Sequence, residues 1–210
     1  LFQLRDRRRG HGQVDGGVTI MAYAVCLVLD EAGATEVTRL WQQLAVAGIA
    51  NDMMALGYPP HITLCVTQDE VDEAETVAHV GTLAVRALEP IWFTGIGAFP
   101  NDPRAVVWLT PAAHSGMTML HGAMSAVLNW QLDAHYAVPH WTPHCTLSSA
   151  VEKPKLLDAL RLAATNFAPF SCQVIRIELV QFPPVRVLHS MGLSTSLLTS
   201  PPPPAAAPRF

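Results

Sequence analysis

The sequence predicts an α+β protein built from two pseudo-symmetric lobes, with duplicated antiparallel sheets, outer helices and a central cleft. Three observations lead to this prediction. Strand-like runs alternate with amphipathic helical segments, the same order of elements occurs twice, and each occurrence contains the motif Pro-His-x-Thr-Leu. A chain of 210 residues is long enough for one domain or for two small fused lobes.

The first half of the chain is expected to form a buried strand, an amphipathic helix, a motif strand, an acidic helix and two further strands. The acidic residues of the second helix gather in its first turns, where they favour the helix dipole. A Pro/Asn/Asp turn separates the last two strands. The expected bounds are, in order, 23–30, 31–50, 61–67, 69–88, 91–98 and 105–110.

The second half repeats this plan, with a helix, a loop rich in His, Pro and Trp, a motif strand, a second helix and two strands. Their expected bounds are 113–130, 131–143, 144–149, 152–167, 171–182 and 185–193. The repetition predicts an internal duplication about a pseudo-two-fold axis, with lobes over about 21–110 and 111–195. Residues 1–20 are expected to be a disordered N-terminal extension, and 196–210 an extended Pro/Ala-rich tail.

The two motifs, 83 positions apart, each place a histidine and a threonine on one face of a strand. Successive side chains of a strand alternate between its faces, so His61 and Thr63 point the same way. The same holds for His144 and Thr146. Two such strands side by side would form a cluster of two imidazoles and two hydroxyls.

This cluster suits the cleavage of a phosphodiester by in-line attack, which needs a base for the nucleophile and an acid for the leaving oxygen. Histidine titrates near neutrality and serves in either role. Threonine hydroxyls can donate hydrogen bonds to the phosphoryl oxygens, and the scheme needs no metal. A single motif is more often an ordinary strand whose histidine bonds a backbone carbonyl; two matching copies favour catalysis.

The paired motifs resemble the two-histidine (2H) phosphoesterase superfamily, which includes 2′-5′ RNA ligase-like proteins and 2′,3′-cyclic phosphodiesterases. Residues 95–109, Gly-Ile-Gly-Ala-Phe-Pro-Asn-Asp-Pro-Arg-Ala-Val-Val-Trp-Leu, are similar to a Phe-Pro…Arg…Val-Leu-Trp segment of the ligase-like branch. The resemblance covers roughly residues 21–195. That branch usually places Arg or Lys just before its second histidine, whereas this chain has Trp141-Thr142-Pro143.

The resemblance implies metal-independent hydrolysis of a 2′,3′-cyclic or 2′-5′ phosphodiester, with no cofactor. The catalytic residues would be His61, Thr63, His144 and Thr146, and the order of acid and base stays open. Two alternatives are a protein that binds a nucleotide or RNA end without turnover, and a 2′-5′ RNA ligase. The low basic content and the missing basic residue before the second motif disfavour the ligase.

Three further residues are candidates for substrate binding. Arg104 is expected to hold a phosphate, because a guanidinium binds phosphate oxygens bidentately. Tyr23 and Trp141 are expected to lie near the cleft, where an aromatic ring can stack on a base. The alternatives are an exposed arginine in a hairpin and aromatic rings that pack in the core.

The composition restricts the partners. A net charge of −4 and a pI near 6.1 argue against a long nucleic-acid groove but allow a small nucleotide or an RNA end. No His-Glu-x-x-His or glycine-rich phosphate loop occurs in the sequence, and we predict no metal site. The four separated cysteines fit buried reduced thiols and a cytoplasmic protein. The apolar run over 18–29 is too short to cross a membrane.

Overall fold

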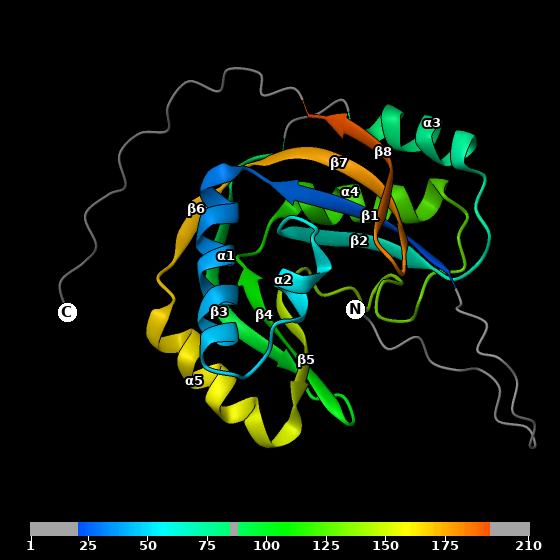
Figure 1. The fold of residues 1–210 in the computed structure, drawn as a ribbon. Helices are drawn as coiled ribbons and strands as arrows, with labels where there is room; N and C mark the ends of the chain where they lie inside the picture. Colours follow the sequence, from blue (N-terminus) through cyan, green and yellow to red (C-terminus); the bar gives the residue numbers. More distant parts are fainter. Residues whose placement is uncertain (1–20, 85–87, 194–210) are drawn as a thin grey trace, which may run out of the picture.

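A computed structural model describes residues 21–84 and 88–193, which form an eight-stranded antiparallel sheet in the order β6-β3-β4-β5-β2-β1-β7-β8 (Figure 1). The α+β class and the antiparallel pairing predicted from the sequence are confirmed. The elements, in chain order, are β1 (Ala22–Leu29), α1 (Glu31–Val46), α2 (Asp52–Leu56), β2 (His61–Thr67), α3 (Glu73–Leu83), β3 (Ile91–Phe99), β4 (Arg104–Pro111), α4 (Ser115–Val127), β5 (Cys145–Glu152), a 3₁₀ turn η1 (Lys153–Lys155), α5 (Leu156–Asn166), β6 (Phe170–Cys172), β7 (Val174–Phe182) and β8 (Arg186–Gly192).

The two halves of the sheet do not coincide with the two halves of the chain. One half contains β6, β3, β4 and β5, and the other contains β2, β1, β7 and β8. The expected lobes over about 21–110 and 111–195 stay a prediction, and the halves of the sheet do not follow them, because β3 pairs with a strand of the second half of the chain and β7 with a strand of the first. The order is still compatible with a two-fold axis between β2 and β5, and the internal duplication stays a prediction.

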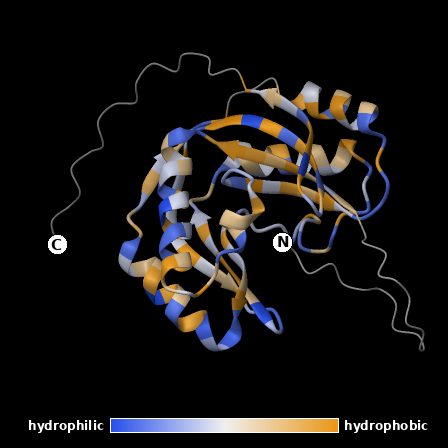
Figure 2. Ribbon diagram, in the orientation of Figure 1, coloured by the Kyte–Doolittle hydropathy of each residue, from blue (hydrophilic) through white to orange (hydrophobic). Residues whose placement is uncertain are grey.

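The four longer helices, α1, α3, α4 and α5, cover one face of the sheet. In Figure 1, α1 and α5 lie beside the half that holds β3, β4 and β5, while α3 and α4 lie beside the half that holds β1 and β2. Their buried side chains join those of the strands in one apolar cluster, which includes Leu40, Ile62, Met117 and Leu147. Figure 2 shows β1 and β2 coloured as mostly hydrophobic, as expected for strands buried in the centre of a sheet.

The opposite face of the second half carries a smaller apolar cluster. Ala24 and Cys26 of β1, Val180 of β7 and Tyr58 belong to it. Side chains on this face alternate with those that face the helices, so β1 is buried on both sides. All four cysteines are buried and free of disulfides, and burial raises the pKa of the Cys26 thiol to about 12.

Several bounds differ from those expected. The short helix α2 was missed, since its five residues are too few for a periodic pattern. The expected strand over 171–182 is interrupted at Gln173, and β5 extends to Glu152, the residue expected to start a helix. The predicted extension (1–20) and tail (196–210) lie outside the described residues. None of the helices described combines the length and hydropathy needed to cross a bilayer.

Two glycine substitutions test the packing of this fold. A Cβ at Gly97 of β3 would lie 2.4 Å from the Trp108 ring, whereas a Cβ at Gly122 of α4 would meet nothing within 4 Å. Gly97→Ala should lower the free energy of unfolding by about 1–3 kcal/mol through overpacking. Gly122→Ala should raise it by about 0.5–1 kcal/mol through helix propensity. Urea unfolding measures both, and equal effects would contradict the packing described.

Candidate active site

The two motif strands meet at the centre of the sheet. In the described chain β2 and β5 share one residue pair, Ile62 with Cys145, whose side chains face the helices. Continuing this antiparallel register by one residue in each direction sets His61 opposite Thr146 and Thr63 opposite His144. All four side chains then share the face that carries no long helix. The two histidines lie on a diagonal of this arrangement, where neighbours are about 7–8 Å apart.

A β-bulge follows the threonine in each motif. On β2, Thr63 pairs with Cys26 and Cys65 with Val25, so Leu64 is an extra residue. On β5, Thr146 pairs with Trp108 and Ser148 with Val107, so Leu147 is the extra residue. Bulges bend a strand and change the direction of its side chains, and they are common next to active sites. The leucine of each motif thus anchors a bulge in the core.

Both imidazoles are held in the same way through Nδ1. His61 Nδ1 lies 2.8 Å from the carbonyl oxygen of Pro59, and His144 Nδ1 lies 2.7 Å from that of Thr142. Because a carbonyl oxygen accepts hydrogen bonds and donates none, Nδ1 carries the proton in both rings. In the neutral ring Nε2 carries no proton and can accept one, and in the protonated ring Nε2 carries a proton that it can donate. Either ring can accept or deliver a proton at Nε2.

An aromatic ring packs edge-on against each imidazole. Tyr58 contacts His61 with ring centroids 4.8 Å apart and planes at 63°, and Phe99 contacts His144 at 5.2 Å and 82°. Trp108 also lies beside His144, at 5.6 Å. These rings exclude water from one side of each histidine and restrict its rotation.

Burial shifts both histidines toward their neutral forms. It lowers the pKa of His61 to about 4, with a contribution from His144, against the opposing effect of the bond to Pro59. Burial also lowers the pKa of His144, and the neighbouring His135 adds to this shift. In the protein without substrate both imidazoles are therefore neutral near pH 7, which is the form that a general base requires.

A pocket of about 540 Å³, including the part open to solvent, lies against the first motif. Its polar lining consists of Tyr58, His61, Thr63 and Thr146, and the rest is apolar or thiol: Ala24, Cys26, Met53, Leu56, Val66, Val180, Phe182 and Val185. No Lys, Arg, Asp or Glu side chain is part of this lining in the described residues. Among those residues, no three His, Cys, Asp or Glu side chains gather as metal ligands either.

Two indole rings support the motif threonines from the sides. Trp141 Nε1 donates to the Thr63 carbonyl oxygen, and Trp41 Nε1 of α1 donates to that of Thr146, each at 3.0 Å. Trp141 also stacks on His121, with centroids 4.1 Å apart and planes at 11°. The expected base-stacking role of Trp141 finds no support in this geometry, because its N–H and one ring face are already engaged in the protein.

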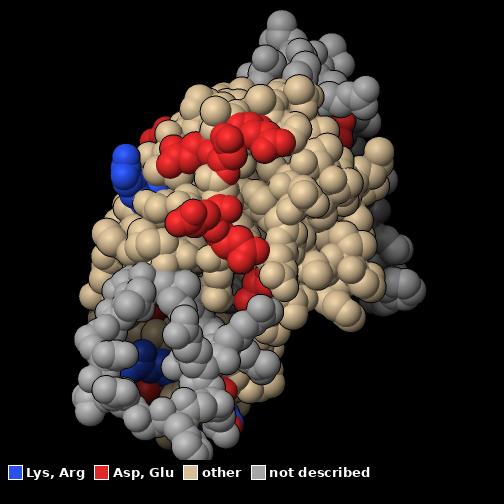
Figure 3. Space-filling view, turned by 90° about the vertical axis from the view of Figure 1, so that its right-hand side faces the viewer, with Lys and Arg blue, Asp and Glu red and all other residues tan. Residues whose placement is uncertain are grey.

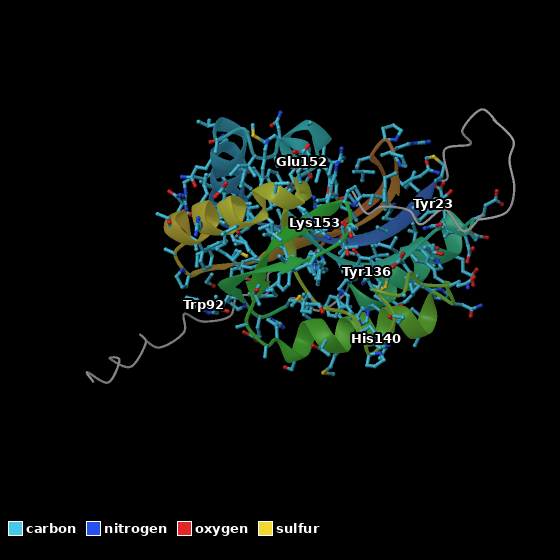
Figure 4. All side chains as sticks on the ribbon, turned by 90° about the horizontal axis from the view of Figure 1, so that it is seen from below. Tyr23, Trp92, Tyr136, His140, Glu152 and Lys153 are labelled. Carbon is cyan, nitrogen blue, oxygen red and sulfur yellow. The ribbon has the colours of Figure 1, made fainter. Side chains whose placement is uncertain are left out.

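The structure separates the other two expected binding residues from the histidines. Arg104 is exposed at the first position of β4, four residues or about 13 Å from Trp108 beside the second motif. Tyr23 shares the helix-facing side of β1 with Val25, opposite the side of the pocket, and its hydroxyl accepts a bond from Gln181 at 3.0 Å. Figure 4 shows Tyr23 near one end of the molecule and Glu152, the strand partner of Arg104, nearer its middle.

Sequence reasoning missed Asp52, which fixes α2 to the second motif strand. Its carboxylate accepts bonds from Ser148 Oγ at 2.7 Å and from the Ser149 amide and hydroxyl at 2.7 and 2.9 Å. Tyr58 and Glu178 were also missed, and the bond between them, 2.7 Å long, joins positions 120 residues apart. Nothing in the local sequence indicates such a contact; the two serines directly after the second motif were the available signal for Asp52.

Comparisons with known proteins identify relatives. The model of the 2′-5′ RNA ligase superfamily matches residues 29–183. TT0787 of Thermus thermophilus has a similar structure, with a TM-score of 0.52 and 16% identity over 82% of this chain and 97% of that chain. LigT of E. coli, in a complex with 3′-AMP, has a TM-score of 0.52 and 15% identity over 83% and 99%. A search of curated proteins found no significant match.

The low pKa of His61 predicts that the folded protein loses stability in acid. The unfolded residue gains its proton near pH 6.5 and the folded one near pH 4, so stability falls as the pH drops between these values. The slope from this residue is at most about 1.4 kcal/mol per pH unit. NMR of the imidazole Cε1 proton should show a midpoint near pH 4; a midpoint near 6.5 would contradict the burial described.

The indole bonds predict a second set of stability effects. Trp41→Phe and Trp141→Phe should each lower the free energy of unfolding by about 1–2 kcal/mol, because a partly buried threonine carbonyl loses its donor. Trp92→Phe is the matched control, since that side chain is 55% exposed. It should change stability by less than about 0.5 kcal/mol. Denaturant unfolding followed by circular dichroism compares the three variants.

Proposed function

The chain belongs to the 2′-5′ RNA ligase superfamily, and from this membership we propose that it is a metal-independent phosphodiesterase acting on 2′,3′-cyclic or 2′-5′ bonds of nucleotides or RNA ends. The observation that carries the proposal is the matched pair of imidazoles at the junction of β2 and β5. Each is bonded through Nδ1 to a backbone carbonyl, so each offers Nε2 for proton transfer.

In the proposed reaction one neutral histidine removes a proton from water as its oxygen attacks phosphorus. The bond from phosphorus to the leaving ribose oxygen breaks, and the second histidine, in its protonated form, gives that oxygen a proton. The protons balance, because one histidine takes up a proton and the other releases one. For a 2′,3′-cyclic phosphate the departing 3′ oxygen leaves a 2′-phosphate.

The threonines and the buried setting complete the mechanism. The hydroxyls of Thr63 and Thr146 donate to the non-bridging oxygens, and both residues line the pocket beside His61. Hydrogen bonds to developing charge are stronger where water is excluded. Because both histidine pKa values lie below the ordinary value, the negative phosphate must raise one of them on binding. Proton transfer would therefore depend on the bound phosphate itself.

The surroundings of the site favour a small substrate. The pocket next to the motifs is largely apolar, which suits an uncharged sugar or base attached to one phosphodiester. Figure 3 shows one face of the molecule on which acidic side chains gather, and a long polyanion would be repelled there. The nucleotide bound by E. coli LigT, a protein of the same fold, fits this substrate class.

Turnover of 2′,3′-cyclic AMP in the presence of EDTA tests the proposal. The wild-type protein should hydrolyse it, and His61→Ala and His144→Ala should each lower kcat by at least about 100-fold, since each would remove a proton-transfer group. Phosphate-ester products resolved by chromatography measure the rate. Thr82→Ala, on α3 and away from the pocket, should retain full activity.

Three outcomes separate the alternatives. Loss of wild-type activity in EDTA that returns with a divalent metal would contradict a metal-independent mechanism. Activity that survives either histidine substitution within tenfold would contradict the two-histidine mechanism. Binding of 3′-AMP by calorimetry without turnover of cyclic or 2′-5′ diesters would favour a binding protein.

A further inference from the structure

We propose that Tyr58, anchored by the buried carboxylate of Glu178, is a positioning residue that fixes the imidazole of His61. This inference rests on the proposed function, because it assigns a role beside one of the two proposed catalytic histidines. A chain of contacts leads from β8 to the first motif.

A row of paired residues crosses four strands behind Thr63. Thr63 of β2 pairs with Cys26 of β1, Cys26 pairs with Glu178 of β7, and Glu178 pairs with Ser190 of β8. Residues paired in this way share one face of a sheet, so Glu178 lies on the same face as the motif side chains. The carboxylate is only 4% exposed.

Three donors keep Glu178 charged. Tyr58 Oη donates to Oε2 at 2.7 Å, and Arg176 Nε and Ser190 Oγ donate to Oε1 at 2.6 and 2.9 Å. Burial alone would raise the pKa of this carboxyl, but these bonds outweigh it and hold the pKa below its ordinary value. Burial raises the pKa of the Tyr58 hydroxyl far above its usual range, so this group stays a donor. The carboxylate therefore holds the phenol ring in one orientation.

The ring held in this way contacts His61. Tyr58 is 6% exposed and lies edge-on to the imidazole at 4.8 Å, on the wall of the pocket that His61 and Thr63 also line. The bond from Nδ1 to Pro59 fixes one edge of the imidazole but leaves the ring free to rock about that bond. The Tyr58 ring blocks this movement and thereby fixes the direction of Nε2. Small displacements of a proton-transfer group lower catalytic rates strongly.

The second motif lacks this arrangement. The corresponding row runs from Thr146 through Trp108 to Gly97, and the ring edge-on to His144 is Phe99, which has no hydroxyl. This row contains no ionisable side chain. The two histidines are thus supported differently, and a charged anchor exists behind the first one.

Two variants that each remove one hydrogen bond from Glu178 test the proposal. Tyr58→Phe removes the bond from the residue that contacts His61, and Ser190→Ala removes a bond of similar length from a residue outside the pocket lining. Both variants should remain folded, since each keeps two of the three donors. A purely structural role of the Glu178 cluster predicts equal effects of the two variants.

The first measurement is the NMR titration of His61 in the protein without substrate, which needs no turnover. Tyr58→Phe should change the midpoint by at least about 0.5 pH units and broaden the Cε1 signal, while Ser190→Ala should leave both unchanged. The second measurement is hydrolysis of 2′,3′-cyclic AMP. Tyr58→Phe should lower kcat at least tenfold with KM changed less than twofold, and Ser190→Ala should keep kcat within twofold.

Equal effects of the two variants on both measurements would overturn the positioning role. A wild-type protein without hydrolase activity, combined with the expected difference in the His61 titration, would overturn the proposed function and support the positioning role. Hydrolysis by the wild type that Tyr58→Phe leaves unchanged would overturn this inference alone.

Discussion

The site depends on the narrow junction between the two halves of the sheet. Within the described residues β2 and β5 are joined at Ile62 and Cys145, and this pair lies directly between the histidine and the threonine of each motif. A longer ladder would hold the strands flat against each other. Here the ladder is short. The threonine carbonyls accept hydrogen bonds from the indoles of Trp41 and Trp141, and a bulge follows the threonine of each motif. The two imidazoles share the Nδ1 bond to a backbone carbonyl.

The order of the strands in the sheet places residues from distant parts of the chain beside this junction. Because β7 and β8 pair beside β1, residues near position 180 support the first motif, and the pocket next to His61 is lined from β1, β2 and β7. This pairing sets the buried carboxylate of Glu178 behind His61, whereas the pairing of β4 with β5 sets Trp108 beside His144. The two motifs are alike, but the residues that surround them differ. The two histidines would need such a difference to take different roles in proton transfer.

The sequence was sufficient to predict the α+β class, most strands and the shared face of each motif, because strand alternation depends on local pattern alone. It was insufficient for the strand order, since pairing of β7 with β1 depends on contacts between residues about 150 positions apart. For the same reason the positions of Tyr23 and Arg104 could not be predicted: Tyr23 lies on the helix-facing side of β1, and Arg104 lies at the first position of β4. Their roles in substrate binding stay predictions. Tyr58, Asp52 and Glu178 carry no local signal of their partners.

We propose that His61 and His144 act as one unit on a single phosphodiester. A double-mutant cycle on kcat for 2′,3′-cyclic AMP, with His61→Ala, His144→Ala and the double variant, tests it most directly. Groups that act together are strongly non-additive, so each single variant should lose nearly as much activity as the double variant. Losses that multiply would show two independent contributions and would contradict the account.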